Sequence, residues 1–315
     1  MVAARRAAWV ASVGAVLAVG CTSTPVTKLV DPLGVFFSQE EPVRIGINRV
    51  HLPLSPLAWH PPWWPLQEAL TREVGRPVQF ESLQPFQIKE HLRDGRLSFA
   101  LVTATDYAEI AEADGPDVLC VAVNAAGRSE RVGLIVAAAN SDVKSVADLK
   151  GKRFAFGPRR HPVLHVAAVD ALAQGGVSVA DLRKELLPLP GSLQFHLNGP
   201  EAAKAIVYEL GIEAGVIDEL AYEKWPATGG TLLPLSFSRD QVRVLARTAA
   251  VPEDAVLVAP DCDPDLAEKV KRFLEAGAND VPAVLEPLEI AKFVPGQAAA
   301  HRAFAATARA VLEKQ

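Results

Sequence analysis

Three neighbouring side chains, Arg159, Arg160 and His161, have the chemistry to bind an anion. They lie between an apolar run at 154–156, which predicts a short strand, and Pro162, whose fixed φ suits the first residue of a helix. Guanidinium groups bind phosphate and carboxylate oxygens bidentately, and the unpaired N–H groups of a helix start also favour anions. In open α/β sheets, ligands bind where strand ends meet helix starts. The sequence therefore predicts an oxyanion site at this loop, with solvent-exposed arginines as the alternative.

Polar residues at two other predicted strand ends could complete a cleft. Thr103, Thr105 and Tyr107 follow the strand expected at 98–102, and Asp218 ends another apolar segment. A carboxylate at such a place is costly unless it is paired or reaches water in a crevice. If the two halves of the chain are pseudo-symmetric, Thr103 and Asp218 face each other across that cleft. The alternatives are helix capping for the threonines and Asp218, and core packing for Tyr107.

Three of the five tryptophans lie close together, at Trp59, Trp63 and Trp64, between the first expected strand and the first expected helix. Aromatic rings on a loop at a strand end can line a ligand cleft, so Trp63 and Trp64 are candidates for the site. The alternative is that these rings cover the core of their own domain.

The sequence carries no signature of catalysis or of a cofactor. It has no nucleophile elbow, no P-loop and no Rossmann glycine fingerprint, so we expect neither an enzyme nor a cofactor. His161 and His165 have the i, i+4 spacing of two metal ligands on a helix. Because no acidic helix motif accompanies them, solvent-facing histidines are the better explanation, and no metal site is predicted.

The composition is that of a globular chain, with 315 residues of which half are hydrophobic and 22% are charged. This length is enough for two ordinary domains. The net charge of −5 argues against nucleic acid as a partner, because binding a phosphate backbone needs a cationic surface. Any anion site must therefore be local.

The amino-terminal segment has the pattern of a processing signal. Two arginines precede an apolar run, 7–20, that is too short to span a bilayer and ends in small residues before Cys21. This pattern resembles a bacterial lipobox, which implies cleavage before Cys21 and attachment of a lipid to it. Residues 1–20 are then the signal peptide and 21–41 a tether. An ordinary secretory peptide is the alternative.

Cys120 and Cys262 are the remaining cysteines. Export implies an oxidising compartment, in which the two could form one disulfide. Each lies beside apolar, strand-like sequence, so burial as a small hydrophobic side chain is the favoured interpretation.

From residue 43 onward, short apolar strands alternate with amphipathic helices, which is typical of an α/β fold with parallel sheets. The strands are expected at 43–47, 77–81, 98–102, 118–123, 132–138, 154–156, 186–189, 214–217, 242–248 and 255–259. The helices are expected at 65–74, 85–93, 200–210, 264–276 and 298–313, with two more between Ser145 and Gly151 and between Pro162 and Gly175. Ser145 and Asp148 form a capping-box pattern, and Gly151 can end that turn in a left-handed conformation.

The stretch from 141 to 176 resembles the strand, loop and helix segment of ABC-transporter substrate-binding proteins of the phosphate, phosphite and phosphonate type. The similarity keeps the same order over residues 43 to 275. LRDGRLSFALVTATDYAEI resembles the family's first-lobe strand and aromatic loop, PEAAKAIVYELGIEAGVID its second-lobe helix and strand, and VRVLARTAAVPEDAVLVAP its return segment. The family's anion loop is rich in Ser, Thr and Gly, whereas this chain has Arg159 and Arg160 there.

This resemblance implies a two-lobed α/β fold of the periplasmic-binding-protein type. Each lobe would be a mostly parallel sheet flanked by helices, with the ligand in the cleft between the lobes. Residues 42–132 and 246–315 would form the first lobe, and residues 133–245 the second.

The resemblance also implies roles for individual residues. Tyr107 matches an aromatic residue of the family, and Asp218 resembles a ligand-contacting aspartate. Either His196 or Asn198 lies where the family often has a histidine, and we take Asn198 as the candidate.

The implied function is that of a solute-binding lipoprotein of an ABC importer. It would be a monomer, held through the lipid on Cys21 at the periplasmic side of the cell envelope. It would bind a small anionic ligand, such as a phosphonate or phosphate, and work with permease and ATPase subunits. The alternatives are a ligand sensor of the same fold that has lost transport and an enzyme on a similar two-lobed frame.

Overall fold

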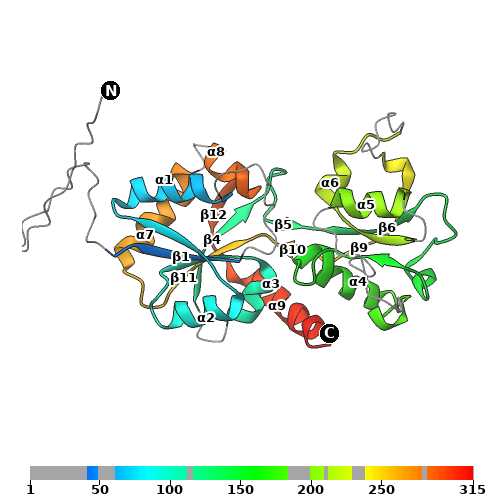
Figure 1. Ribbon diagram of the computed structural model, residues 1–315, viewed down its shortest axis with the longest axis horizontal. Helices are drawn as coiled ribbons and strands as arrows, with labels where there is room; N and C mark the ends of the chain where they lie inside the picture. The colour runs from blue at the N-terminus through cyan, green and yellow to red at the C-terminus, as the bar shows by residue number, and fades with distance from the viewer. Residues whose placement is uncertain are drawn as a thin grey trace, which may run out of the picture. The chain divides into compact units, whose positions relative to one another are not determined.

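The computed structural model of the protein is shown in Figure 1. It describes residues 41–48, 61–111, 116–183, 199–208, 212–228, 238–278 and 282–314. In this part of the chain, two β-sheets each pack against helices, and a short two-stranded ribbon lies between them (Figure 1).

The first lobe is built on a six-stranded sheet in the order β12-β4-β11-β3-β1-β2. Its strands are β1 (Val43–Ile47), β2 (Val78–Ser82), β3 (Phe99–Val102), β4 (Asp117–Val123), β11 (Ala255–Val258) and β12 (Lys292–Pro295). β1 pairs in parallel with β2 and with β3, whereas β11 and β12 pair antiparallel with their neighbours. The C-terminal part of the chain thus supplies β11, which lies inside the sheet between β3 and β4.

The second lobe is built on a four-stranded sheet in the order β7-β8-β6-β9. Its strands are β6 (Gly133–Ala138), β7 (Phe154–Ala155), β8 (Ala214–Asp218) and β9 (Val242–Arg247). Only the pair of β7 and β8 is parallel. Parallel pairing, which was expected for most of both sheets, is therefore limited to β1 with β2 and β3 and to β7 with β8. The strands β6 and β9, which carry the chain into and out of the second lobe, run antiparallel to their neighbours, and so do β11 and β12 of the first lobe.

Helices cover both faces of the first sheet (Figure 1). One face carries α1 (Trp64–Val74), α7 (Pro264–Arg272) and α8 (Pro282–Leu285), and the other carries α2 (Pro85–Arg93), α3 (Ala104–Ile110) and α9 (Ala298–Leu312). The helical segments of the second lobe are η2 (Val146–Leu149), η3 (Pro162–Ala167), α4 (Ala168–Gln174), η4 (Val179–Asp181), α5 (Gly199–Tyr208), α6 (Glu219–Glu223) and η5 (Arg239–Gln241).

Apolar packing continues from the first lobe into the second through α9. This helix packs against α3 of the first lobe and also against η3 and α4 of the second. Tyr107 of α3 and Phe304 of α9 belong to the same buried cluster as Phe156 and Leu164 of the second lobe. A shared apolar core therefore links the two lobes on the α9 side.

Local sequence signals shape the turns of the second lobe. Ser145 and Asp148 form the expected capping box, in which Asp148 Oδ2 accepts a hydrogen bond from the Ser145 N–H at 2.9 Å. Gly151 has the expected left-handed conformation, with φ of 73°. The segment between them, η2, is a 3-10 turn rather than an α-helix. The strand expected at 186–189 lies outside the described residues.

Cys120 and Cys262 are both free thiols. Cys120 is fully buried in β4, and Cys262 packs against the same apolar core of the first lobe. Burial raises the pKa of the Cys120 thiol to about 12, which keeps it protonated at neutral pH. Packing, rather than a disulfide, is therefore their role in the structure.

The chain passes between the lobes at an antiparallel ribbon formed by β5 (Glu130–Arg131) and β10 (Val251–Pro252). Arg131 Nε donates to Glu253 Oε1 at 2.7 Å. His301 of α9 donates through Nε2 to the Glu253 carbonyl at 2.8 Å. Glu253 therefore ties the ribbon to the helix that packs on both lobes.

The strand β9 belongs to the second sheet through its last residue, Arg247, which lies past the lobe boundary expected at 245.

Asp254 lies next to this ribbon, and its side chain is only partly exposed. Burial, followed by the charge of Glu253, raises the pKa of Asp254 to about 7. The charges of Asp106 and Glu289 act in the same direction, and Arg131 acts against them. Asp254 therefore titrates close to neutral pH in the folded protein.

This shift predicts how the free energy of unfolding depends on pH. Between about pH 4 and pH 7, the folded state keeps a proton on Asp254 that the unfolded state has lost, so this group's contribution to stability falls as pH rises. We expect Asp254→Asn to remove up to about 1.4 kcal/mol per pH unit of that slope, measured by urea unfolding at pH 5, 6 and 7. Asp142→Asn, at an exposed site of the second lobe, is the control. Equal slopes in wild type and Asp254→Asn would contradict the shifted pKa.

Candidate ligand-binding site

Two parallel strands of the first lobe end at polar residues. Asn48 follows β1, Thr103 follows β3, and both side chains are buried. Because β1 and β3 are parallel neighbours, their carboxyl ends meet at the same edge of the sheet. Thr103 is also the N-cap of α3, and its Oγ1 accepts a hydrogen bond from the N–H of Asp106 at 3.2 Å. This edge of the sheet therefore carries Thr103, which the sequence predicted for a cleft, and Asn48, which it did not.

Asp106, which is fully buried, is the centre of this group. Its Oδ1 accepts a hydrogen bond from Asn48 Nδ2 at 3.1 Å, and its Oδ2 accepts one from Thr103 Oγ1 at 2.9 Å. Arg160 of the second lobe donates through Nη2 to Asp106 Oδ1 at 3.3 Å. A buried carboxylate needs such partners, because burying an unpaired charge is costly. The loop that carries Arg159, Arg160 and His161 (residues 157–161) is called the anion loop below. The strand ends of the first lobe and the anion loop of the second therefore meet at the Asp106 carboxylate.

The backbone around the anion loop is closely packed. A Cβ on Gly157 would lie 2.4 Å from the Cβ of Leu164, so only glycine fits there without a shift. The N–H of Gly157 donates to the carbonyl of Leu164 at 2.7 Å. His161 caps η3, because its Nδ1 accepts hydrogen bonds from the N–H groups of Val163 at 3.2 Å and Leu164 at 3.0 Å. These contacts fix the loop at both of its ends.

Arg159, Arg160 and His161 have different environments. Arg159 is exposed, and its side chain has no ion-pair partner among the described residues. The Arg160 side chain is 28% exposed and pairs with both Asp106 and Glu109 of α3. His161 is occupied by the helix cap. Their role in ligand binding stays a prediction, but Arg160 is the one that reaches the other lobe.

Asp218, at the end of β8, caps the helix that follows it. Its Oδ1 accepts hydrogen bonds from the N–H groups of Leu220 at 2.8 Å and Ala221 at 3.2 Å. Its Oδ2 lies 3.7 Å from Nη1 of Arg131 in the ribbon between the lobes. The capping role that the sequence left open is therefore present, and a ligand contact stays a prediction.

Thr105 and Tyr107 of α3 are both buried. The Oγ1 of Thr105 has no hydrogen-bond partner among the described residues. The Tyr107 ring packs edge-on against His301 of α9, with 5.3 Å between ring centroids. Tyr107 therefore packs into the core, as one of the two interpretations of the sequence proposed.

The tryptophan candidates belong to the opposite face of the first sheet. Trp63 is buried in the apolar core beneath α1 and stacks on Phe80, with 6.5 Å between ring centroids. Trp64 is the first residue of α1. Trp59, His196 and Asn198 lie outside the described residues.

The acidic partners of Arg160 were not predicted from the sequence. Asp106 stands three residues after Thr103, a spacing typical of a capping acid, and this spacing was the only signal that marked it. Asn48 directly follows the first predicted strand, which is the same signal that singled out Thr103. Nothing local indicates that Glu109 meets an arginine of the other lobe.

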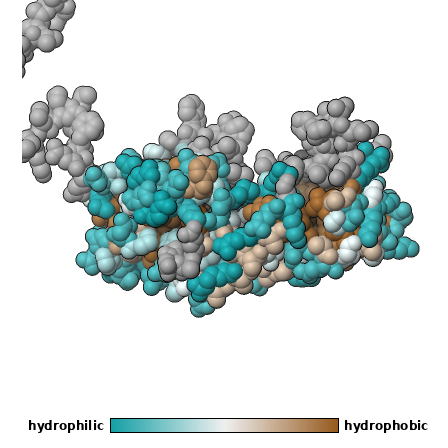
Figure 2. Space-filling model, turned by 90° about the horizontal axis from the view of Figure 1, so that it is seen from below, coloured by the Kyte–Doolittle hydropathy of each residue, from teal (hydrophilic) through white to brown (hydrophobic). Residues whose placement is uncertain are grey.

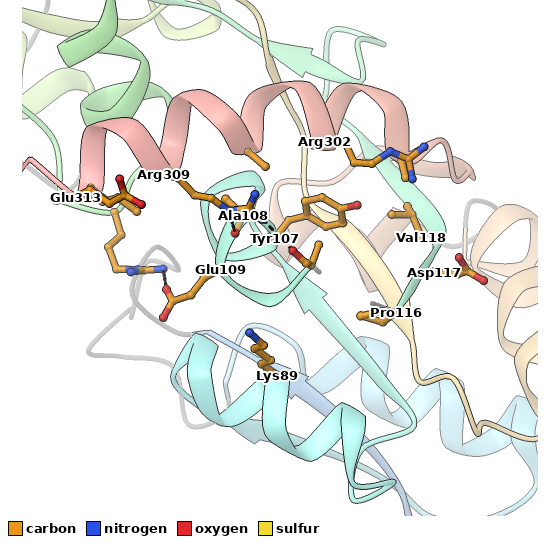
Figure 3. A pocket seen from close by; sticks show the side chains of 15 residues that line it. Lys89, Tyr107, Ala108, Glu109, Pro116, Asp117, Val118, Arg302, Arg309 and Glu313 are labelled. Atoms are coloured by element: carbon orange, nitrogen blue, oxygen red, sulfur yellow. Dashed lines mark hydrogen bonds and ion pairs between the residues drawn. The ribbon is translucent and has the colours of Figure 1, made fainter. Parts of the chain in front are cut away.

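A pocket of about 900 Å³ lies beside this group, along α3 and α9 (Figure 3). Tyr107, Glu109 and Arg160 border it, and Figure 3 shows Lys89 of α2 and Arg309 of α9 on either side of α3. Hydrophilic residues cover much of the face that Figure 2 shows, on the side of α2 and α9. This pocket runs along helices, carries charges of both signs, and shares Arg160 and Glu109 with the ion pair between the lobes.

Among the described residues, no group of three or more His, Cys, Asp or Glu side chains is placed to hold a metal ion. His165 is buried, with its ring 5.1 Å from that of Phe156, so the expectation that it faces solvent is wrong. It packs inward because the residues on either side of it continue the apolar core of the second lobe. Within the same part of the chain, no helix has the length and apolar character needed to cross a bilayer.

Several solved structures share this fold. XAC2383 from Xanthomonas citri, bound to ATP, matches with a TM-score of 0.65 at 15% identity, over 86% of this chain and 98% of that chain. PhnD1 from Prochlorococcus marinus, in complex with methylphosphonate, matches with a TM-score of 0.62 at 11% identity, over 87% and 98%. The binding protein component of an ABC phosphonate transporter from Pseudomonas aeruginosa matches with a TM-score of 0.55 at 16% identity, over 82% of each chain. These likenesses establish the two-lobed fold.

No curated protein sequence matches the chain significantly. A family model described as "ABC transporter, phosphonate, periplasmic substrate-binding protein" matches residues 55–301, which is most of the chain. Members of this family are binding components of transporters rather than enzymes. The protein therefore belongs to the family of periplasmic substrate-binding proteins of phosphonate ABC transporters.

Proposed function

We propose that the protein binds a small phosphonate- or phosphate-like anion between its two lobes and delivers it to the permease and ATPase subunits of an ABC importer. Family membership supports this role. The observation that carries the proposal is Arg160, which extends from the anion loop of the second lobe to the strand ends of the first. A ligand held at that place contacts both lobes, so its binding favours the closed arrangement.

The donor groups around this place suit an oxyanion. Arg159 and Arg160 supply guanidinium groups, which match the oxygen spacing of phosphate, phosphonate and carboxylate. Thr105 adds a buried hydroxyl without a partner among the described residues, and Thr103 adds a second hydroxyl at the same strand end. Methylphosphonate in PhnD1 and ATP in XAC2383 both carry phosphorus oxyanions, which supports the same ligand class.

We expect ligands of this class to raise the melting temperature of the protein. A ligand at 100 times its dissociation constant stabilises the folded state by about 2.7 kcal/mol. Inorganic phosphate, methylphosphonate, ATP and a dicarboxylate are the first probes, each measured by thermal unfolding at two ionic strengths. Arg159→Ala with Arg160→Ala should abolish the response. The matched control is Arg93→Ala with Arg96→Ala, which removes two arginines that pair with Asp94 on the surface of the first lobe.

An unchanged ligand response in the Arg159 and Arg160 double variant would show that the ligand binds elsewhere. A response to none of the four probes, in wild type as in the variants, would count against a phosphorus oxyanion or a dicarboxylate as the ligand.

We also propose that the protein is anchored to the membrane through a lipid on Cys21, at the periplasmic side. Support comes from the short apolar segment that ends in small residues before this cysteine. The residues concerned lie outside the described part of the chain. Lipid on the mature amino terminus holds the receptor close to its membrane partners.

The anchor predicts a clear fractionation result. Wild type should sediment with membranes and be released by detergent, whereas Cys21→Ala should lose the lipid and its membrane binding. The measurement is immunoblotting of membrane and soluble fractions, with Cys262→Ser as the matched cysteine control. Wild type found wholly in the soluble periplasmic fraction would contradict the anchor.

A further inference from the structure

The surroundings of Asp106 are those of a bound oxyanion. One of its oxygens accepts from an amide at 3.1 Å and from a guanidinium at 3.3 Å, and the other accepts from a hydroxyl at 2.9 Å. The amide and the hydroxyl come from Asn48 and Thr103 of the first lobe, and the guanidinium comes from Arg160 of the second. An anionic ligand between two lobes needs this same combination of neutral and charged donors from both sides.

The ion pairs of Arg160 leave one of its hydrogen-bond donors without an acceptor among the described residues. Its Nη2 donates to Asp106 and also to Glu109, whose side chain is 38% exposed. Its Nε is buried and has no acceptor among the described residues. Two carboxylates thus share one nitrogen, and neither forms the two parallel hydrogen bonds that an arginine fork can make. An oxyanion that took both Nε and Nη2 would satisfy the buried donor as well.

The charge balance has a direct consequence for a ligand. Arg160, Asp106 and Glu109 together carry a net charge of about −1 when all three are ionised. An incoming anion therefore meets a site whose positive charge is already compensated. The anion can bind Arg160 only if Asp106 or Glu109 releases it.

We propose that Asp106 and Glu109 are built-in counter-anions of Arg160, which tie the two lobes together when no ligand is bound and which a ligand oxyanion must displace. Displacement favours ligands that can engage the fork with two oxygens, such as phosphate, phosphonates and carboxylates, over monatomic anions. The two carboxylates thereby set the affinity and the selectivity of the site. The displacement step rests on the proposed function, whereas the tie between the lobes does not.

The test uses Asp106→Asn with Glu109→Gln, which keeps the shape of both side chains and removes both charges. Because Asp106 is buried, Glu109→Gln alone is the second variant, at a site whose exposure makes it safe for folding. Arg160→Ala removes the common partner. Asp142→Asn, which breaks an exposed ion pair with Lys152 within the second lobe, is the control. Small-angle X-ray scattering of the ligand-free protein reports the separation of the lobes, and calorimetric titration with inorganic phosphate and with methylphosphonate reports affinity.

We expect the ligand-free double variant and Arg160→Ala to have a larger radius of gyration than wild type and Asp142→Asn. The double variant should bind phosphate about tenfold more tightly than wild type, since an ionic competitor worth about 1.4 kcal/mol has been removed. Glu109→Gln should show a smaller change in the same direction. Arg160→Ala should lose phosphate binding.

Scattering curves that are the same in all variants would overturn the tie between the lobes. Weaker phosphate binding by the double variant would overturn displacement, because it would mean that the carboxylates only orient Arg160. If the scattering changes as expected while no variant binds phosphate or methylphosphonate, the tie is supported and the proposed function fails.

Discussion

The burial of one carboxylate, Asp106, constrains the arrangement of everything around it. A charge without solvent must be met by hydrogen-bond donors and by an opposite charge, and the donors here come from two strand ends and from a loop of the other lobe. Removing the partner of a buried charge costs about 3–5 kcal/mol, and less where the partner is partly exposed, as Arg160 is. Since a whole domain is stable by about 5–15 kcal/mol, this pairing decides where the loop lies.

The lobes are joined by two contacts that differ in physical character. One is the apolar core that α9 shares with α3, η3 and α4. Hydrophobic attraction itself has no preferred direction and grows with the apolar area that is buried. The other is the ion pair of Arg160, which is directional and depends on charge. The apolar contact therefore resists separation of the lobes, whereas the ion pair depends on how they are oriented.

The elements were predictable because their signals are local. Apolar runs, prolines and capping residues gave most strands and helices close to those observed, and the capping box of Ser145 and Asp148 was recognised from four residues of sequence. The elements α3, α8 and β12 were not predicted. The direction of strand pairing was harder to predict. It depends on how β11 and β12 return to the first sheet from the far end of the chain, and no local pattern records that.

The contact between the lobes was predictable only in part, for the same reason. Thr103 and Arg160 were singled out from their places at a strand end and before a helix start, yet the carboxylate that both contact was not, because Asp106 has the sequence pattern of an ordinary capping acid. Their role in ligand binding stays a prediction. Aromatic residues gave no better guidance. Tyr107 and Trp63 occupy positions from which a ring can face either a ligand or a core, and in both cases the ring packs into a core.

The position of β11 also governs the order in which the polypeptide can acquire its structure. The second lobe is one continuous stretch of chain, but the first sheet needs β11 between β3 and β4, and α9 against α3, before it is complete. Contacts between distant parts of a sequence form slowly, because the entropy of closing the intervening loop must be overcome first. The first lobe therefore lacks a finished core until β11 and α9 have been synthesised.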